Sequence, residues 1–244
     1  PHRPAGPLDA PRRARQPEAM IDIRPVAHTI GKILTVIGAM MLAPMAVDWW
    51  HGDPHWMVFL QSAVLTMVSG VMLAVATAGR YDHLTLHQAF LLTSGIWIVL
   101  PAFGALPFML GEPDASFTDA MFESMSGFTT TGTTVFPELD DLARGIHLWR
   151  AILHWAGGLG IVVVAMVFLP VMKVGGMQFF RSEGFDTLGK VLPRAGQIAG
   201  EMTQLYLILT GACLVTYLML GLTGFDAVVQ AFSTVSTGGF SNYD

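Results

Sequence analysis

Five long apolar stretches most constrain what this chain can fold into. They are residues 30–47, 56–78, 88–110, 145–172 and 201–222. A bilayer core about 30 Å thick requires roughly 20 apolar helical residues, because each residue of a helix rises about 1.5 Å. Pro101 and Pro107 in the third stretch do not exclude a helix, since neighbouring helices in a membrane satisfy the freed carbonyls. The pattern predicts an all-α polytopic membrane protein with about five transmembrane helices.

The composition agrees with a lipid environment. Hydrophobic residues make up 52% of the chain, charged residues only 13%, and the mean hydropathy is +0.53. A soluble domain of this length carries about 25% charged residues. The net charge of −5 is modest and no acidic tail occurs, so we expect the lipid bilayer and not nucleic acid as a partner. The single cysteine, Cys213, excludes an internal disulfide and a cysteine-based metal site.

The lysine and arginine residues predict the orientation. If the N-terminus is cytoplasmic, the outer side keeps only Arg144 and Arg150. The cytoplasmic side then receives Arg3, Arg12, Arg13, Arg15, Arg24, Lys32, Arg80, Lys173, Arg181, Lys190 and Arg194. This asymmetry satisfies the positive-inside rule, and Trp49, Trp50 and Trp56 then mark the outer interface.

Two short segments, residues 116–128 and 225–235, are amphipathic and too short to cross a bilayer. Each leads into a polar loop on the predicted outer side, TTTGTT at 129–134 and STGG at 236–239. Backbone that is not helical is tolerated at membrane depth only where protein or a water-filled cavity receives its polar groups. We therefore interpret both segments as re-entrant pore helices that enter the membrane and return to the same side.

The two segments and their loops form a sequence repeat. Residues 119–135 align without gaps on residues 226–242, an offset of 107. The matched pairs include Asp119 with Asp226, Ser126 with Ser233, Thr130 with Thr237, and Gly132 with Gly239. The unit is a helix, a re-entrant helix, a polar loop and a closing helix, and the closing helix of the second unit is expected beyond Asp244. The chain is therefore interpreted as a fragment of a longer protein.

Threonine and glycine in such loops are typical of sites that bind a dehydrated cation. Glycine adopts positive φ, which allows successive carbonyls to turn toward one axis, and threonine adds a hydroxyl oxygen. A ring of these oxygens replaces the water shell of a monovalent cation. The negative C-terminal end of a short helix also favours a cation.

The loop sequences FESMSGFTTTGTTV and AFSTVSTGGFS resemble the first and second pore loops of the Trk/Ktr/HKT potassium-transporter superfamily, especially its bacterial TrkH-type subunits. The stretches MIDIRPVAHTIGKIL and HWAGGLGIVVVAMVFLPVMKVGGMQFFRSE are similar to other parts of that family, so the resemblance covers residues 20–244. It implies a selectivity filter in which potassium is the only bound metal and no cofactor is covalently attached. The implied filter residues are Thr130, Thr131, Gly132, Thr133, Thr237, Gly238, Gly239 and Phe240.

The resemblance also implies the surroundings of this filter. Four quarters from one chain surround each pore in the family, and only two of the four repeats are present here. Family members reside in the bacterial inner membrane, pair as homodimers and rest on a cytosolic nucleotide-binding regulatory subunit. In plant relatives a serine at the first filter glycine is associated with sodium permeation, so Gly132 favours potassium. Gating and any coupling to protons or sodium are left open.

The chain divides into five predicted regions. Residues 1–19 lack the apolar core of a cleavable signal and are a disordered tail or a non-native extension before Met20. The others are an amino-terminal helix pair (20–84), the first helix–pore loop–helix repeat (85–175), a cytoplasmic connection (176–200), and the second repeat, truncated after its pore loop (201–244).

Other charged residues and histidines are interpreted one by one. Glu123 either attracts cations near the vestibule or accepts hydrogen bonds behind the filter. Arg150 either tunes cation access, pairs with a loop carboxylate or extends to the interface.

Asp119 and Asp226 are predicted to cap the two short helices. The pairs His51/His55 and His83/His87 have the i, i+4 spacing of metal ligands but are interpreted as interfacial.

The function predicted from these features is potassium uptake, without enzymatic activity. Two alternatives remain: a non-conducting membrane assembly subunit with packed, dry loops, and a multi-pass membrane enzyme that holds a phosphate at its TTTG loop. The enzyme alternative lacks the glycine-lysine pair of a phosphate-binding loop and a nucleophile with a base.

Overall fold

The computed structural model describes residues 22–81, 84–172 and 191–242, and within these ranges the regular structure is helical with no strand. The predicted tail (1–19), His83 and most of the predicted cytoplasmic connection lie outside the described residues. The helices are α1 (Arg24–Met40), α2 (Leu42–His51), α3 (Trp56–Ala76), α4 (Leu86–Gly104), α5 (Leu106–Leu110), α6 (Phe117–Phe128), the 3₁₀ turn η1 (Leu139–Asp141), α7 (Arg144–Met172), α8 (Val191–Met219) and α9 (Gly224–Val235).

Four helical segments in the described ranges are long and apolar enough to cross a membrane by length and composition. They are Arg24–His51, Trp56–Ala76, His87–Leu110 and Ala199–Met219. They correspond to four of the five predicted spans and confirm an all-helical, multi-pass architecture. The other predicted span lies in α7, a continuous helix of 29 residues and so about 43 Å long.

The first predicted span, 30–47, is too short at both ends. Helix begins at Arg24, with Pro25 in its first turn, where a missing amide removes no helical bond. It continues through α2 to His51 with an interruption at Met41. Pro44 explains the interruption, because it has no amide with which to bond the carbonyl one turn earlier.

The third predicted span is also divided, into α4 and α5. Pro101 lies inside α4, and Pro107 lies in the first turn of α5. A hydrogen bond of 2.9 Å from the amide of Ala105 to the carbonyl of Pro101 closes the last turn of α4. The division into a long and a short helix thus lies next to Pro107, which has no amide to bond the carbonyl of Phe103, whereas Pro101 lies within α4.

The caps of the two short helices differ from the prediction. The cap of α6 is Ser116, whose hydroxyl accepts a hydrogen bond from the amide of Asp119 at 3.2 Å. In α9, Thr223 accepts the equivalent bond from Asp226 at 3.2 Å. The aspartates lie three residues later, and their carboxylates accept from the cap hydroxyls at 2.8 and 2.6 Å. Asp119 and Asp226 therefore support the caps and suit the positive end of each helix, but they are not the caps themselves.

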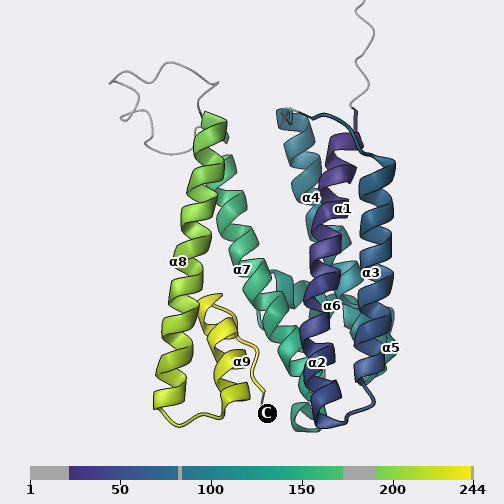
Figure 1. The fold of residues 1–244 in the computed structure, drawn as a ribbon, viewed down its shortest axis with the longest axis vertical. Helices are drawn as coiled ribbons and strands as arrows, with labels where there is room; N and C mark the ends of the chain where they lie inside the picture. The colour runs from purple at the N-terminus through teal and green to yellow at the C-terminus, as the bar shows by residue number, and fades with distance from the viewer. Residues whose placement is uncertain (1–21, 82–83, 173–190, 243–244) are drawn as a thin grey trace, which may run out of the picture.

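Helix α7 is the common partner of both short helices (Figure 1). Helix α6 packs on α7 and α4, while α9 packs between α7 and α8. Helix α1 packs along α3 and against α4, and α2 contacts α7. In Figure 1, α9 runs partway along α8 and the chain then returns toward the end from which α9 began. The buried core includes Phe59, Phe108, Ile146, Trp149 and Leu153.

Large apolar side chains are exposed along α3 and α8. On α3 they include Val64, Leu65, Val68, Val71, Met72 and Val75, and on α8 Leu205, Leu207, Ile208, Leu209, Val215, Leu218 and Met219. A soluble protein rarely exposes apolar patches of this extent, whereas lipid accommodates them. Trp49 and Trp50, at the end of α2, are 64% and 82% exposed, as expected of aromatic residues at a membrane interface.

Candidate functional site

The end of α6 reverses the chain through a Schellman motif. After the C-cap Thr129, Thr130 has a φ of +56°. The amide of Thr130 donates to the carbonyl of Gly127, and the amide of Thr131 to the carbonyl of Ser126, both at 3.0 Å. These two bonds satisfy carbonyls that the helix end would otherwise leave free. The first loop thus starts with a sharp reversal directly after the short helix.

Helix α9 ends in the same way. Thr237 has a φ of +56°, the same value as Thr130. Its amide donates to the carbonyl of Thr234 at 3.0 Å, and the amide of Gly238 to the carbonyl of Ser233 at 2.8 Å. The repeat that the alignment predicts is therefore present in the backbone hydrogen bonds.

A threonine at these two positions is unusual. The left-handed position after a helix is commonly glycine, because a β-branched side chain is strained there. Such strain costs on the order of 1–3 kcal/mol and is concentrated at functional sites. Thr130 and Thr237 both carry this strain, which marks the two reversals as functional candidates.

Serines of the short helices anchor one carbonyl in each loop. Ser126 donates its hydroxyl to the carbonyl of Thr133 at 2.6 Å, and Ser233 donates to that of Phe240 at 3.0 Å. These are equivalent positions of the repeat. Other loop carbonyls accept no hydrogen bond from any residue that the structure describes: those of Thr130, Thr131, Gly132, Thr237, Gly238 and Gly239. Six of the eight predicted filter residues thus retain a free carbonyl oxygen, and the other two carbonyls are tied to the helices.

The two loops lie against each other. A Cβ atom added to Gly132, whose φ is +80°, would lie 2.5 Å from the amide nitrogen and 2.6 Å from the Cα of Gly239. A Cβ on Gly239 would lie 3.9 Å from the carbonyl oxygens of both Thr131 and Gly132. The equivalent glycines of the two repeats are therefore in direct backbone contact, although 107 residues separate them.

Two consecutive glycines of α7 allow this arrangement. A Cβ on Gly157 would overlap the backbone of Phe128, the last residue of α6. A Cβ on Gly158 would lie 2.9 Å from the Cβ of Ser236, the C-cap of α9. Small residues allow close helix contacts in membranes. Helix α7 thus holds the ends of both short helices, and so the start of both loops.

Glu123 lies behind the first loop. Its side chain is fully buried and accepts hydrogen bonds from the Thr134 hydroxyl at 3.0 and 3.1 Å and from the Val135 amide at 3.1 Å. It also accepts from Nε of Arg150 at 2.8 Å. Of its two predicted roles, the geometry matches the hydrogen bonds behind the loop. Arg150 is only 1% exposed and pairs with this helix carboxylate, so it neither extends to the interface nor pairs with a loop carboxylate.

His154 is a neighbour of the second loop that the sequence did not single out as a loop contact. Its ring lies edge-on to the ring of Phe240, with centroids 4.2 Å apart, and packs directly against Gly238. His154 is fully buried and follows Arg150 by one helical turn. The sequence places Arg150 and His154 one turn apart on the same helix, but it does not show that this face of α7 meets the second loop.

His51, at the end of α2, and His55, just before α3, contact different groups. His51 contacts the carbonyl of Val47 at 2.8 Å and an Arg144 nitrogen at 2.6 Å. His55 lies 3.5 Å from the buried carboxylate of Asp48. No group of three potential metal ligands occurs within the described ranges.

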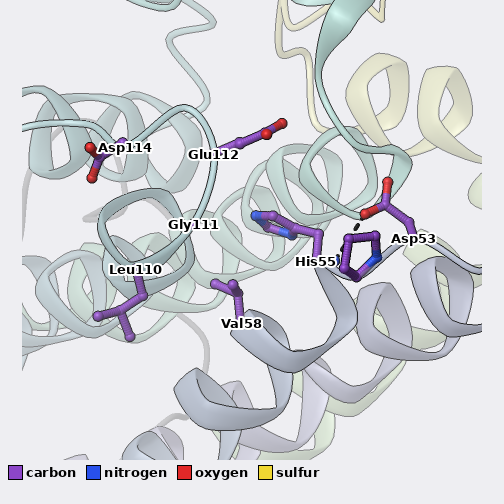
Figure 2. Close-up of a pocket in the computed structure, with 8 residues that line it drawn as sticks. Asp53, His55, Val58, Leu110, Gly111, Glu112 and Asp114 are labelled. Carbon is purple, nitrogen blue, oxygen red and sulfur yellow. Dashed lines mark hydrogen bonds between the residues drawn. The ribbon is translucent and has the colours of Figure 1, made fainter.

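A separate hollow lies beside His55 (Figure 2). Its carboxylates come from the turn between α2 and α3, at Asp53, and from the α5–α6 connection, at Glu112 and Asp114. Acidic side chains of this kind raise the local concentration of cations. None of residues 129–134 or 236–240 lines the hollow, so it is distinct from the two loops.

The serine anchors permit a direct test. Replacing Ser126 by alanine is expected to lower the thermal midpoint of unfolding slightly, because one hydrogen bond contributes about 0.5–1.5 kcal/mol. Ser233→Ala should have a similar effect, since the two bonds are equivalent. Ser69→Ala, in the middle of α3, is the control. A melting curve in both anchor variants that is the same as that of the unaltered protein would contradict an anchoring role.

Comparison with known proteins places the chain in a family. Residues 55–244 match the family described as TrkH, cation transport protein. The Trk system potassium uptake protein TrkI of Halomonas elongata is 36% identical over 220 residues, which is 90% of this chain and 45% of that protein. The corresponding TrkH proteins of Vibrio parahaemolyticus and Escherichia coli K12 are 37% and 36% identical, and the match covers 92% and 91% of this chain.

A solved structure agrees with these matches. The crystal structure of the potassium transporter TrkH from Vibrio parahaemolyticus has a TM-score of 0.81 at 36% identity, over 92% of this chain and 45% of that one. The chain spans about half the length of the curated relatives it matches, at 45–47%. The family is one of transporters, which confirms the prediction that the chain is not an enzyme. The chain belongs to the TrkH family of cation transport proteins.

Proposed function

We propose that the whole protein carries potassium across the bacterial cytoplasmic membrane through a pore to which these two loops contribute. The observation that carries the proposal is the contact between Gly132 and Gly239, which brings six free carbonyl oxygens onto two adjoining strained loops. Similar proteins of this family are named potassium uptake proteins. Relatives are about twice as long, and further loops of this kind complete the pore in the whole protein.

The transport step requires no covalent chemistry. The ion loses water at the outer mouth, and the loop carbonyls replace its hydration shell. The C-terminal ends of α6 and α9 meet the loops directly, so their partial negative charge favours a cation there. The membrane potential then drives the ion inward, at about 2.3 kcal/mol per charge per 100 mV.

In this proposal α7 is the fifth membrane-spanning helix, and α6 and α9 are re-entrant pore helices. The N-terminus is cytoplasmic and both loops face the outside in this proposal, which the positions of the basic residues support. A homodimer and a cytosolic nucleotide-binding regulatory subunit are the proposed partners.

Rubidium uptake tests the proposal. The full-length protein in proteoliposomes is expected to take up radioactive rubidium, and potassium should inhibit this uptake at a lower concentration than sodium. Gly211→Ala is a suitable control, because a Cβ added on this part of α8 would meet nothing within 4 Å. A non-conducting assembly subunit would give no uptake above that of empty vesicles, and equal inhibition by sodium and potassium would contradict a potassium-selective pore.

A further inference from the structure

One buried ion pair is connected to both loops. Arg150 of α7 and Glu123 of α6 lie 2.8 Å apart, with side chains 1% and 0% exposed. Glu123 is part of the first loop's support, since it accepts hydrogen bonds from Thr134 and Val135. These contacts fix the carboxylate, and with it the guanidinium, relative to the first loop.

The guanidinium of Arg150 reaches the second loop by two further contacts. Its Nη1 donates to the carbonyl of Ser241 at 3.2 Å. Its central carbon lies 4.1 Å from the centroid of the Phe240 ring, within the range of a cation–π interaction. Phe240 is therefore held at two points: Arg150 lies over its ring, and Ser233 donates a hydrogen bond to its carbonyl. The connection therefore runs from the first loop through Glu123 and Arg150 to the second loop.

This connection is not a feature of the repeat itself. The position of Glu123 aligns with Gln230 in the second unit, where no acidic side chain is present. The other anchors, Ser126 and Ser233, occur in both units. An acidic residue thus occurs only in the first unit, at the position that pairs with Arg150.

The charges of the pair suit a position close to a cation path. An unpaired guanidinium beside Phe240 would repel a cation at the neighbouring carbonyl oxygens. Glu123 at 2.8 Å compensates that charge. The arginine therefore supplies directed donors and a planar surface to the second loop without a net positive charge. Lysine does not reproduce this, because an ammonium is a compact charge without a planar fork.

We propose that Arg150 is a positioning residue that sets the second loop against the first, so that discrimination between potassium and sodium depends on it. The inference rests on the proposed function, because it assigns a role within the same pore. Selectivity of a carbonyl cage depends on the number and placement of its oxygens. A shift of the Phe240 side of the loop would displace the carbonyl of the adjacent Gly239, which is free and lies beside the first loop.

An Arg150→Lys variant of the full-length protein tests the inference. It keeps a positive charge beside Glu123, so we expect it to fold, but it loses the simultaneous contacts with Ser241 and Phe240. The measured quantity is the ratio of the sodium and potassium concentrations that halve rubidium uptake in proteoliposomes. This ratio is expected to fall by about tenfold or more, as for loss of a hydrogen bond from a charged group. Phe240→Leu, which removes the ring but keeps the ion pair, should lower the ratio as well.

Arg144→Lys is the matched control. Arg144 lies on the same helix, is exposed, contacts His51 and lies 5.8 Å from the Phe225 ring. The ratio measured for Arg144→Lys should therefore equal that of the unaltered protein. An unchanged ratio in both Arg150→Lys and Phe240→Leu would overturn the inference, even if either variant lowered the yield or the thermal midpoint, since Arg150 would then be purely structural. Absence of selective uptake in the unaltered protein would instead contradict the proposed function.

Discussion

Selective rubidium uptake by a Gly132→Ala variant of the full-length protein is expected to fall by roughly tenfold or more. Gly132 has a φ of +80°, and a residue with a Cβ adopts the left-handed region at a cost of roughly 1–2 kcal/mol. The added Cβ would also lie 2.5 Å from the nitrogen and 2.6 Å from the Cα of Gly239. Overpacking of this kind costs about 1–3 kcal/mol, and about 1.4 kcal/mol corresponds to a factor of ten.

The reason for so large an effect is that both contacted atoms belong to the backbone. No side chain can rotate away, so one of the two loops must move and take its free carbonyls with it. Uptake and the inhibition by sodium and potassium are measured in proteoliposomes, with the thermal midpoint in detergent as a check on folding. The effect should appear in uptake and selectivity even where the protein folds, because the displaced groups are the proposed ion ligands.

Gly239→Ala is the informative comparison. It is the equivalent residue of the repeat, yet its φ is not positive and its added Cβ would be 3.6 Å from the nearest atom, the Cα of Gly132. Gly239→Ala should therefore lose less selective uptake than Gly132→Ala, and Gly211→Ala on α8 should lose none. Equal losses at Gly132 and Gly239 would contradict the steric explanation, and normal uptake in Gly132→Ala would contradict the contact between the loops.

Apolar length predicted the membrane helices, because burial of a helix in lipid depends mainly on composition. It failed at the ends of the first span, since helix formation depends on the backbone as well. Arg24 and His28 are polar and fell outside the apolar window, yet Pro25 starts the helix there and His28 contacts the carbonyl of Ala74 at 2.8 Å. The interruption at Met41 follows from Pro44, a signal that was present in the sequence.

The repeat alignment correctly predicted two similar loops, because the residues that reverse the chain are local. It missed the caps for a simple reason: Ser116 and Thr223 lie just before the aligned segment, each three residues ahead of an aspartate. This spacing is that of a helix N-terminus and was readable in the sequence. The link from Arg150 to Ser241 was not readable, since it joins residues 91 positions apart through the packing of α7.

A Gly157→Ala variant is expected to lower the thermal midpoint in detergent by several degrees and to reduce uptake. The added Cβ would overlap the carbonyl oxygen of Phe128 and lie 2.7 Å from its carbonyl carbon and 2.8 Å from its Cα. As at Gly132, these are backbone atoms, so either α7 or the last turn of α6 must move. The expected destabilisation is about 1–3 kcal/mol, which is the usual cost of overpacking.

Gly160→Ala separates this contact from a general effect of glycine in α7. Gly160 lies one turn later on the same helix, and a Cβ there would meet nothing within 4 Å. Alanine is favoured over glycine in a helix by roughly 1 kcal/mol, so the control should be as stable as the unaltered protein or slightly more so. Phe128 is followed directly by the residues that reverse the chain, and displacement of its backbone is transmitted to the first loop. Uptake by Gly157→Ala should therefore fall further than its lowered stability alone explains. A variant with normal stability and normal uptake would show that α7 does not hold the end of α6.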